Sequence, residues 1–383
     1  MTFTLHVDSE KFHKHIKSVV AQYTKSDART VPVIKGNGYG FGRRVLAQQS
    51  AALGVNEIAV GTVYELEQAL ADFAGKIKVL EPFNPHDPAA NRVWEKVCAH
   101  NAARIIAIIA GDDFAAAAAV GIKHVHLEGL TSMSRFGILQ HDMDELIHAD
   151  THGITIEGVH LHLPLVPAEI RHIAMLETTK ELSQRKQSPA VLEVFAWVLQ
   201  LAPHVNKKGS ALHVSVSHVS AKEISAIHQL AKLFDFDISL DARVGTSLWL
   251  GEPKALRTTG TVLAVHDGGY GHRGVGYTQV DSHGHKKIVV ISGGTSHGVA
   301  LAAPANASTM RKRGIAITEG LYQALGKVRS PFKFKGDNLI FVEAPHMHTS
   351  MVWCENESIK VGDEVECTVR QTTAHFDRIA GLD

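Results

Sequence analysis

The stretch that decides the fold is a short apolar run that leads through a lysine into a glycine-rich loop. It is Val31-Pro32-Val33-Ile34-Lys35-Gly36-Asn37-Gly38-Tyr39-Gly40-Phe41-Gly42. The β-branched residues predict a buried strand, and Lys35 stands at its carboxyl end. Burial disfavours an ammonium group and lowers its pKa, so a lysine in this place can become nucleophilic toward a carbonyl compound. The alternative is a strand and a flexible turn from which the Lys35 amine extends into solvent.

Composition and charge exclude several classes of protein. The 383 residues are enough for two domains, or for one large barrel with an appendage. Acidic and basic residues balance at 39 each, so no net charge points to nucleic acid. No signal-like segment opens the chain, and no apolar run approaches the roughly 20 residues that span a bilayer, so we expect a cytoplasmic protein. Cys98, Cys354 and Cys367 lack CxxC spacing, which favours neither a disulfide framework nor a thiolate zinc site.

Apolar, β-rich runs alternate with helical stretches from residue 31 to about residue 245. The eight runs are 31–34, 57–60, 77–80, 104–109, 124–128, 154–162, 212–217 and 238–243. This alternation predicts an α/β fold with a parallel (β/α)8 barrel of the TIM type, and an open doubly wound sheet is the competitor. In such a barrel the functional groups stand at the carboxyl ends of the strands, which is where Lys35 stands.

After Gly251 the runs become shorter and are separated by Gly, Asp and His turns. They are 261–265, 275–280, 287–292, 338–341, 350–354 and 364–368. Within 305–335 we expect a helix around 318–325 and a basic loop marked by glycine and proline. The sequence therefore predicts a barrel domain over 1–250 and a mostly β domain over 251–383.

The lysine stretch resembles the cofactor motif of the alanine racemase family, usually VKANAYGHG, which binds pyridoxal 5'-phosphate. Three further segments resemble family motifs, in family order and at roughly family spacing. They are the segment 126–138, similar to HLKxDTGMxRLG, the loop that starts near 216, similar to ANSAG, and the segment 243–251, similar to RxGxxxYG. The resemblance implies a fold type III enzyme that binds pyridoxal 5'-phosphate and works as a homodimer with active sites shared between subunits.

The resemblance implies roles for residues around the amine. Lys35 would hold the cofactor covalently and act as a base on one face of the substrate Cα, with Tyr39 beside it. Arg135 matches the arginine that contacts the cofactor phenolate oxygen and the substrate carboxylate. Where many relatives have a carbamylated lysine, this chain has Glu128, which could supply the negative charge through a charge-assisted hydrogen bond to Arg135.

Further residues match the family's ring and phosphate contacts. His162 matches the histidine that stacks on the pyridine ring, although together with His160 it could also form half of a metal site. Ser217 matches the phosphate-binding serine, and Gly245 and Thr246 match backbone donors to the phosphate. Arg243 matches the arginine that bonds to the pyridine nitrogen. Because a guanidinium with a pKa above about 12 keeps its proton, it discourages protonation of the ring and suits reversible proton transfer at Cα.

The second domain departs from the family at the second catalytic base. The family tyrosine lies in a GYADG-like loop, and the corresponding loop here is Ser292-Gly293-Gly294-Thr295-Ser296-His297-Gly298. Thr295 takes the place of the tyrosine, and an alkyl hydroxyl is a poor general base unless another group activates it. His297 could serve directly or activate a hydroxyl, or it could have no catalytic duty. Met347 matches the methionine whose backbone helps to bind the substrate carboxylate.

We therefore expect an amino-acid racemase that depends on pyridoxal 5'-phosphate and has an altered second base. One alternative is another reaction of this fold on a D-amino acid, such as an aldol cleavage or a dehydration. That reaction could be metal-assisted, because His346 and His348 alternate as on one face of a strand. The other alternative is a protein that binds the cofactor without turnover. We expect a small amino-acid substrate, with no nucleic acid or membrane partner.

Overall fold

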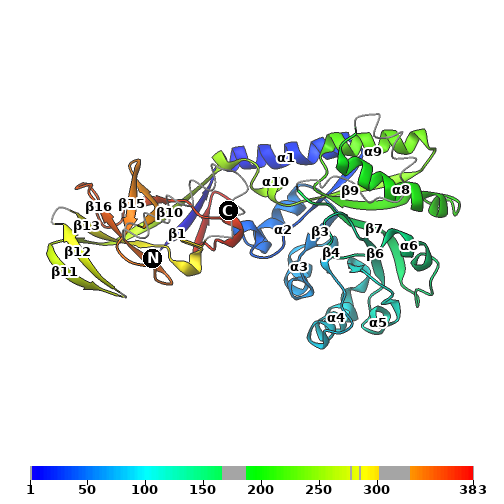
Figure 1. The fold of residues 1–383 in the computed structure, drawn as a ribbon, viewed down its shortest axis with the longest axis horizontal. Helices are drawn as coiled ribbons and strands as arrows, with labels where there is room; N and C mark the ends of the chain where they lie inside the picture. Colours follow the sequence, from blue (N-terminus) through cyan, green and yellow to red (C-terminus); the bar gives the residue numbers. More distant parts are fainter. Residues whose placement is uncertain (1, 166–186, 277, 284–285, 302–327, 383) are drawn as a thin grey trace. The chain divides into compact units, whose positions relative to one another are not determined.

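The computed structural model describes residues 2–165, 187–276, 278–283, 286–301 and 328–382 (Figure 1). The chain forms two compact units. The barrel unit comprises Lys14–Gly36 and Arg43–Gly251, and the β-rich unit comprises Met1–His13, Asn37–Gly42 and Glu252–Asp383. In the described part of the chain, no helix is both long enough and apolar enough to cross a membrane.

The barrel unit is built on eight parallel strands. They are β2 (Ala28–Pro32), β3 (Glu57–Val60), β4 (Lys76–Pro82), β5 (Ile105–Ile109), β6 (His124–Gly129), β7 (Thr155–His162), β8 (Leu212–Ser217) and β9 (Ile238–Val244). Their order in the sheet is β2-β9-β8-β7-β6-β5-β4-β3. The sheet closes where Val33 bridges Ala59 in parallel and the Ile34 N–H donates to the Ala59 carbonyl at 2.8 Å. The predicted (β/α)8 barrel is therefore confirmed, and the open sheet is excluded.

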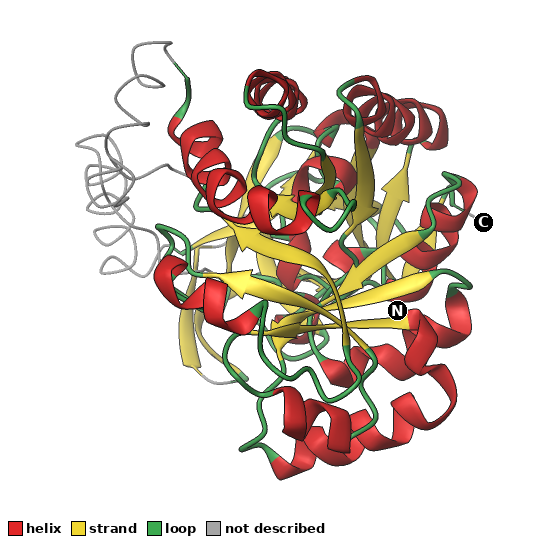
Figure 2. Ribbon diagram, turned by 90° about the vertical axis from the view of Figure 1, so that its right-hand side faces the viewer, coloured by secondary structure: helices red, strands yellow, loops and turns green. Residues whose placement is uncertain are grey.

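Helices flank the strands of the barrel (Figure 2). They are α1 (Ser9–Lys25), α2 (Arg43–Ala52), α3 (Leu66–Asp72), α4 (Pro88–Asn101), α5 (Phe114–Ala119), α6 (Gln140–Leu146), α8 (Pro189–Asn206), α9 (Ala221–Leu233) and α10 (Thr246–Trp249). Several begin at side chains that satisfy the first backbone donors. Asp87 accepts from the N–H groups of Ala89 and Ala90 at the start of α4, and Ser220 and Glu223 form a capping box at the start of α9.

The β-rich unit contains a closed antiparallel barrel of six strands. They are β10 (Leu256–Asp267), β13 (Lys287–Ser292), β14 (Arg329–Phe334), β15 (Asp337–Phe341), β16 (Thr349–Cys354) and β17 (Glu364–Cys367). Pairing of β13 with β10 closes the ring around a core that includes Val262, Ile291, Phe332 and Val352. Two strands extend the sheet: β1 (Phe3–Val7) pairs with β10, and β18 (Arg378–Ala380) pairs with β1. The predicted mostly β second domain is confirmed.

Some predicted elements of the β-rich unit differ from the structure. The single strand expected over 275–280 is wrong, because β11 (Tyr270–Val275) and β12 (Thr278–His283) form a hairpin there. Gly276, with φ +40°, lies in the turn between them. The basic loop expected before residue 335 is wrong over Arg329–Phe334, which is strand β14. The helix expected around 318–325 lies outside the described residues.

Candidate active site

Lys35 lies just beyond the carboxyl end of β2, and the peptide that follows it is fixed on both sides. The Gly36 N–H donates to Glu65 Oε1 at 3.0 Å, and the Gly61 N–H donates to Glu65 Oε2 at 2.7 Å. Arg43 Nη1 donates to the Gly36 carbonyl at 2.6 Å. Gly36 adopts φ +66°, a left-handed conformation that suits glycine. The loop after Lys35 is thus held by charged side chains of neighbouring segments.

The surroundings of Lys35 lower the pKa of its amine. Part of the side chain is open to solvent, but partial burial lowers its pKa, and the positive charges of Arg135 and Arg243 lower it further. The carboxylate of Glu65 opposes them. A lysine whose pKa is lowered offers more unprotonated amine at neutral pH, and the unprotonated amine is the nucleophilic form.

Arg243 is buried in β9 and is held by three hydrogen bonds. Nη1 donates to the carbonyl of Ser215 at 2.6 Å and to its hydroxyl at 3.1 Å, and Nη2 donates to the Leu161 carbonyl at 2.8 Å. A guanidinium has five N–H groups, so two are not used by these bonds. Burial lowers the pKa of Arg243 and the carboxylates of Glu128 and Asp241 oppose this, but a guanidinium stays protonated at neutral pH.

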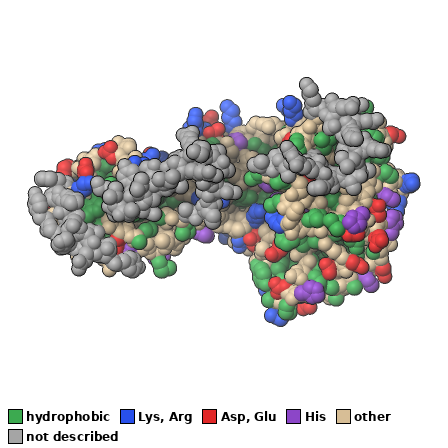
Figure 3. Space-filling view, in the orientation of Figure 1, with side chains coloured by type: hydrophobic (Ala, Val, Ile, Leu, Met, Phe, Trp, Pro, Cys, Tyr) green, Lys and Arg blue, Asp and Glu red, His purple; other side chains and the backbone are tan. Residues whose placement is uncertain are grey.

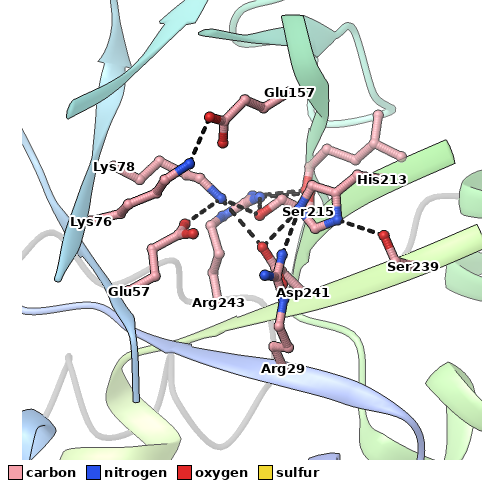
Figure 4. Close-up of polar contacts among 11 residues, drawn as sticks. Arg29, Glu57, Lys76, Lys78, Glu157, His213, Ser215, Ser239, Asp241 and Arg243 are labelled. Atoms are coloured by element: carbon pink, nitrogen blue, oxygen red, sulfur yellow. Dashed lines mark hydrogen bonds and ion pairs between the residues drawn. The ribbon is translucent and has the colours of Figure 1, made fainter. Parts of the chain in front are cut away.

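Next to Arg243 the barrel carries a cluster of charged and polar side chains, which we call the polar core: Arg29, Glu57, Lys78, His213, Ser215 and Asp241 (Figure 4). Lys78 on β4 is fully buried, and its Nζ lies 2.8 Å from Glu57 Oε1, 3.1 Å from Ser215 Oγ and 3.6 Å from Asp241 Oδ2. Because β4 is not a neighbour of β8 or β9 in the sheet, these contacts cross the barrel. Ser215 therefore joins Lys78 to Arg243.

Asp241 carries the fully buried negative charge of the polar core. Its carboxylate accepts from Arg29 Nε at 2.8 Å and lies 2.8 Å from His213 Nε2. Burial alone would raise the pKa of Asp241, but the hydrogen bond from His213 and the charges of Lys78 and Arg29 outweigh it. The pKa lies below its ordinary value, and the group is ionised at neutral pH.

A cavity of about 480 Å³ opens toward the amino ends of the barrel strands. Its charged side chains are engaged with one another: Lys76 Nζ lies 2.6 Å from Glu157 Oε1, and Arg29 pairs with Asp241. In (β/α)8 enzymes the chemistry occurs at the opposite, carboxyl ends of the strands. We therefore place the candidate site with Lys35 and not in this cavity.

Two histidines and a serine meet at the carboxyl ends of β7 and β8. His162 and Ser217 are register partners, and Ser217 Oγ lies 2.7 Å from His162 Nδ1. The rings of His162 and His218 have centroids 5.2 Å apart in an edge-on contact. Burial, followed by the positive charges of Arg243 and Arg135, lowers the pKa of His162 to about 3. His162 is therefore neutral at physiological pH.

Glu128 lies on β6, which is opposite β2 in the ring of eight strands, and Arg135 lies in the segment after β6. Burial raises the pKa of Glu128 to about 7, against the charges of Arg243 and Arg135. Its Oε2 is buried without a hydrogen-bond partner among the described residues. Arg135 is exposed, and its guanidinium lies over the Phe136 ring, 5.1 Å from the centroid. The hydrogen bond predicted between Glu128 and Arg135 is not formed in the described structure.

Gly245 and Thr246 stand where β9 leads into α10. The Gly245 carbonyl accepts from the N–H groups of Leu248 and Trp249, both at 3.0 Å. The indole N–H of Trp249 donates to the Val33 carbonyl at 2.8 Å. This bond ties the loop after β9 to the segment that leads into Lys35.

Thr295 and His297 lie in the β-rich unit, in a short 3-10 helix (Thr295–His297) after β13. His297 is buried, and both of its ring nitrogens have partners. Nδ1 accepts from the Gly294 N–H at 3.2 Å, and Nε2 lies 3.3 Å from Asp377 Oδ1. These contacts give His297 a structural role. The catalytic roles of Thr295 and His297 stay predictions.

Met347 and Tyr39 also lie in the β-rich unit. The Met347 carbonyl accepts from the Ser296 N–H at 3.0 Å, and its side chain is exposed. Tyr39 is buried and has φ +54°. His346 Nε2 lies 2.7 Å from Glu343 Oε1, and within the described ranges no group of three side chains is arranged to hold a metal ion. The predicted contacts of Met347 and Tyr39 with a ligand stay predictions.

The barrel unit brings together the predicted residues Lys35, Arg135, His162, Ser217, Arg243, Gly245 and Thr246 at the carboxyl ends of its strands. Sequence reasoning missed His218 and the polar core. Histidines are numerous, 25 in all, and several lie on the surface of the barrel unit (Figure 3), which hides the buried ones among them. The alternation of polar residues along β8 and β9 was the available signal.

Comparison with known proteins identifies the family. Residues 7–253 match the family described as alanine racemase, N-terminal domain. The chain belongs to this family. No curated protein sequence matches the chain.

Solved structures of alanine racemases share the fold of this family member at low identity. The enzyme from Clostridium difficile 630 is 16% identical, with a TM-score of 0.64 over 96% of this chain and 87% of that one. The biosynthetic enzyme from Pseudomonas aeruginosa is 18% identical, with a TM-score of 0.58 over 97% and 91%. The enzyme from Bartonella henselae with covalently bound pyridoxal phosphate is 18% identical, with a TM-score of 0.59 over 96% and 90%.

Proposed function

We propose that the chain is an amino-acid racemase that depends on pyridoxal 5'-phosphate, with Lys35 as the residue that holds the cofactor. The observation that carries the proposal is a lysine of lowered pKa at the carboxyl end of a (β/α)8 barrel, facing Arg135 and Arg243. Such a lysine suits covalent attachment of an aldehyde, and the positive charges beside it suit an anionic ligand. When bound, pyridoxal phosphate supplies an electron sink that acidifies the Cα–H of an amino acid.

The residues at the barrel mouth fit this group. Three of the five N–H groups of Arg243 donate to Ser215 and Leu161. Two N–H groups remain, so Arg243 can also donate to a ring nitrogen. His162 is neutral, which suits an aromatic contact with a ligand ring. Arg135 is exposed and charged, so it can bind a carboxylate. Lys35 takes a proton from Cα on one face and returns it.

The proton on the other face needs a second group. In our proposal this group comes from the β-rich unit of a partner subunit in a homodimer, with Thr295 or His297 as the candidates. Both ring nitrogens of His297 are engaged in the described structure, which weakens that candidate. This observation favours one second hypothesis, a cofactor-binding protein without turnover.

The test replaces Lys35 with Ala and measures two properties of the purified full chain. The first is the visible absorbance that reports attachment of pyridoxal phosphate to a lysine. The second is the exchange of the α-proton for solvent deuterium, measured by NMR over both enantiomers of the common amino acids. We expect Lys35→Ala to lose the absorbance and to lower the rate of α-proton exchange by about 10²- to 10⁴-fold. The control is Lys232→Ala, which removes an exposed lysine from α9.

The two measurements separate the hypotheses. Exchange with both enantiomers supports the racemase. Absorbance without exchange across the whole panel supports binding without turnover. Lys35→Ala protein that keeps both the absorbance and the exchange would contradict the assignment of Lys35.

A further inference from the structure

His218 has an unusual backbone and an uncommitted ring. It is the first residue after β8, and its φ of +60° is uncommon for a residue other than glycine. Such conformations are strained and gather at ligand sites. The ring contacts His162 but has no hydrogen bond within the described part of the chain. The backbone thus holds an imidazole with free nitrogens at the barrel mouth.

The charged groups that act on His218 are all cations. They come from three other parts of the barrel: Arg243 from β9, Lys35 from the segment after β2, and Arg135 from the segment after β6. Partial burial and these three charges lower the pKa of His218, so the ring is neutral at physiological pH. The nearest other titratable ring is His162, which is also neutral.

The carboxylates of the site do not compensate these charges at His218. Glu128 acts on Arg243 and Arg135, and Glu65 acts on Lys35, but no carboxylate is among the groups that shift the pKa of His218. A position near several cations attracts an anion when no carboxylate balances their charge. His218 also occupies the loop after the seventh strand of the barrel, and (β/α)8 proteins commonly bind phosphate at the loops after strands seven and eight.

We propose that His218 binds the phosphate group of the ligand and takes up one proton from solvent when that group enters the site. A phosphate dianion beside the ring favours the imidazolium, which then donates a charge-assisted hydrogen bond to a phosphate oxygen. The identification of the phosphate as that of pyridoxal phosphate rests on the proposed function, whereas the phosphate role of His218 does not.

Proton uptake makes binding depend on pH with a definite sign. Binding raises the pKa of His218, so affinity increases as pH falls from above the bound-state pKa toward the free-state pKa. Between pH 8.5 and pH 6.5 we expect phosphate binding to tighten by about three- to tenfold. The second pKa of a phosphate ester is about 6, so the phosphate stays mainly dianionic over this range.

The test measures the binding of phenyl phosphate, a simple phosphate monoester, by titration calorimetry on the full chain. Lys35→Ala protein serves as the parent, so that the lysine amine cannot contribute to proton uptake. Repeating each titration in two buffers of different ionisation enthalpy gives the number of protons taken up. We compare this parent with His218→Asn, because asparagine tolerates the left-handed backbone and does not titrate. The matched control is His141→Asn, at a histidine whose side chain is 76% exposed.

We expect the parent and the His141→Asn protein to take up protons and to bind more tightly at pH 6.5. The His218→Asn protein should bind phosphate more weakly at pH 6.5 and lose the extra proton uptake. Equal pH dependence in parent and His218→Asn protein overturns the proposal, and so does a parent that binds no phosphate. Unchanged phosphate binding also overturns it, and if His218→Asn made in the wild-type chain then loses α-proton exchange from one enantiomer only, His218 is an acid–base residue.

The outcomes distinguish this proposal from the proposed function. If phosphate binds with proton uptake that depends on His218, but the wild-type chain never gains visible absorbance with pyridoxal phosphate, the proposed function fails alone. If the wild-type chain gains the absorbance while His218→Asn leaves proton uptake unchanged, the role of His218 fails alone.

Discussion

Replacing His126 and His160 together should weaken the response of the barrel unit to mild acid. The two residues lie on β6 and β7 and are 1% and 2% exposed. Burial lowers the pKa of each well below 6.5, and the positive charges of Lys78 and Arg243 add to the effect. The folded barrel keeps both rings neutral, while the unfolded chain protonates them. Above pH 6.5 the two histidines are neutral in both states and do not reduce the free energy of unfolding. Below pH 6.5 the unfolded chain binds protons that the folded barrel does not, so the free energy of unfolding falls as pH falls.

The magnitude follows from the linkage between protonation and unfolding. Each histidine that stays neutral in the folded state lowers the free energy of unfolding by about 2 kcal/mol between pH 7 and pH 5, so the pair lowers it by about 4 kcal/mol. Glu128 acts in the opposite direction, because burial raises its pKa to about 7. Its contribution is complete below about pH 4.5 and is lost as pH rises through 7, which adds about 2 kcal/mol on acidification. Glu128 and His162, whose pKa is lowered to about 3, are present in both proteins, so their effects cancel in the comparison. On going from pH 7 to pH 5, the double variant should therefore lose about 4 kcal/mol less than its parent.

The assay is urea unfolding of His126→Gln/His160→Gln protein and its parent at pH 7, 6 and 5. Both carry Trp353→Phe, which removes the one tryptophan of the β-rich unit. The fluorescence of Trp94, Trp197 and Trp249 then reports the barrel unit. The exposed control His141→Gln should keep the pH dependence of the parent. An identical pH dependence in the double variant and the parent would refute the reasoning, because glutamine does not titrate.

Two further substitutions test the polar core and a helix cap, both by urea unfolding at pH 7. Asp241→Asn should lower the free energy of unfolding by about 3–5 kcal/mol, because it removes a fully buried carboxylate that accepts from Arg29 and lies 3.6 Å from the buried Lys78 amine. Asp235→Asn, at an exposed aspartate, should change it by less than about 0.5 kcal/mol. A loss below about 1 kcal/mol for Asp241→Asn would mean that water solvates the polar core. Ser220→Ala should cost about 0.5–2 kcal/mol, since its Oγ accepts from the Glu223 N–H at 3.3 Å at the start of α9. Ser225→Ala within the same helix should cost less, and equal costs would argue against the cap.

The barrel strands could be predicted because their apolar runs are local. Strands β3 and β8 have the predicted bounds, and most of the other barrel strands differ by only one or two residues at an end. The exception is β2, which begins at Ala28 and ends at Pro32 instead of covering 31–34. Arg29 and Thr30 look like loop residues in the sequence, but they pair with Asp241 and Ala242 of β9. The extent of β2 is set by a strand about 200 residues away, which local pattern does not contain.

The strands that sequence reasoning missed depend on distant partners as well. Strand β1 pairs with β10, so its residues Phe3 to Val7 face Gly260 to Leu256. Strand β14 contains Pro331, and a proline argues against a strand because it cannot donate to the ladder. The Pro331 carbonyl nevertheless accepts from the Thr368 N–H at 3.0 Å. Non-local pairing therefore overrides the local signal in both cases.

The residues at the mouth of the barrel could be predicted from the sequence, whereas the polar core could not. Lys35, His162, Ser217 and Arg243 end strands or follow them, so their positions at the barrel mouth follow from the fold alone. The polar core was hidden because alternation defines two faces of a strand without saying which one points inward. Polar residues usually face solvent. In this barrel helices cover the outer face, so the polar face of β8 and β9 points into the interior.

The polar interior of the barrel determines the position of Arg243. The interior of a (β/α)8 barrel is ordinarily packed with branched apolar side chains. Here Lys78 is fully buried beside Glu57 and Asp241, and buried ion pairs contribute little net stability compared with apolar packing. What the ion pairs do supply is a fixed position for Ser215. The Ser215 hydroxyl receives a hydrogen bond from Lys78 and, together with its carbonyl, holds Arg243. The charges deep in the barrel thus fix the guanidinium that faces the candidate site, and a substitution at Lys78 should alter ligand binding without touching the ligand.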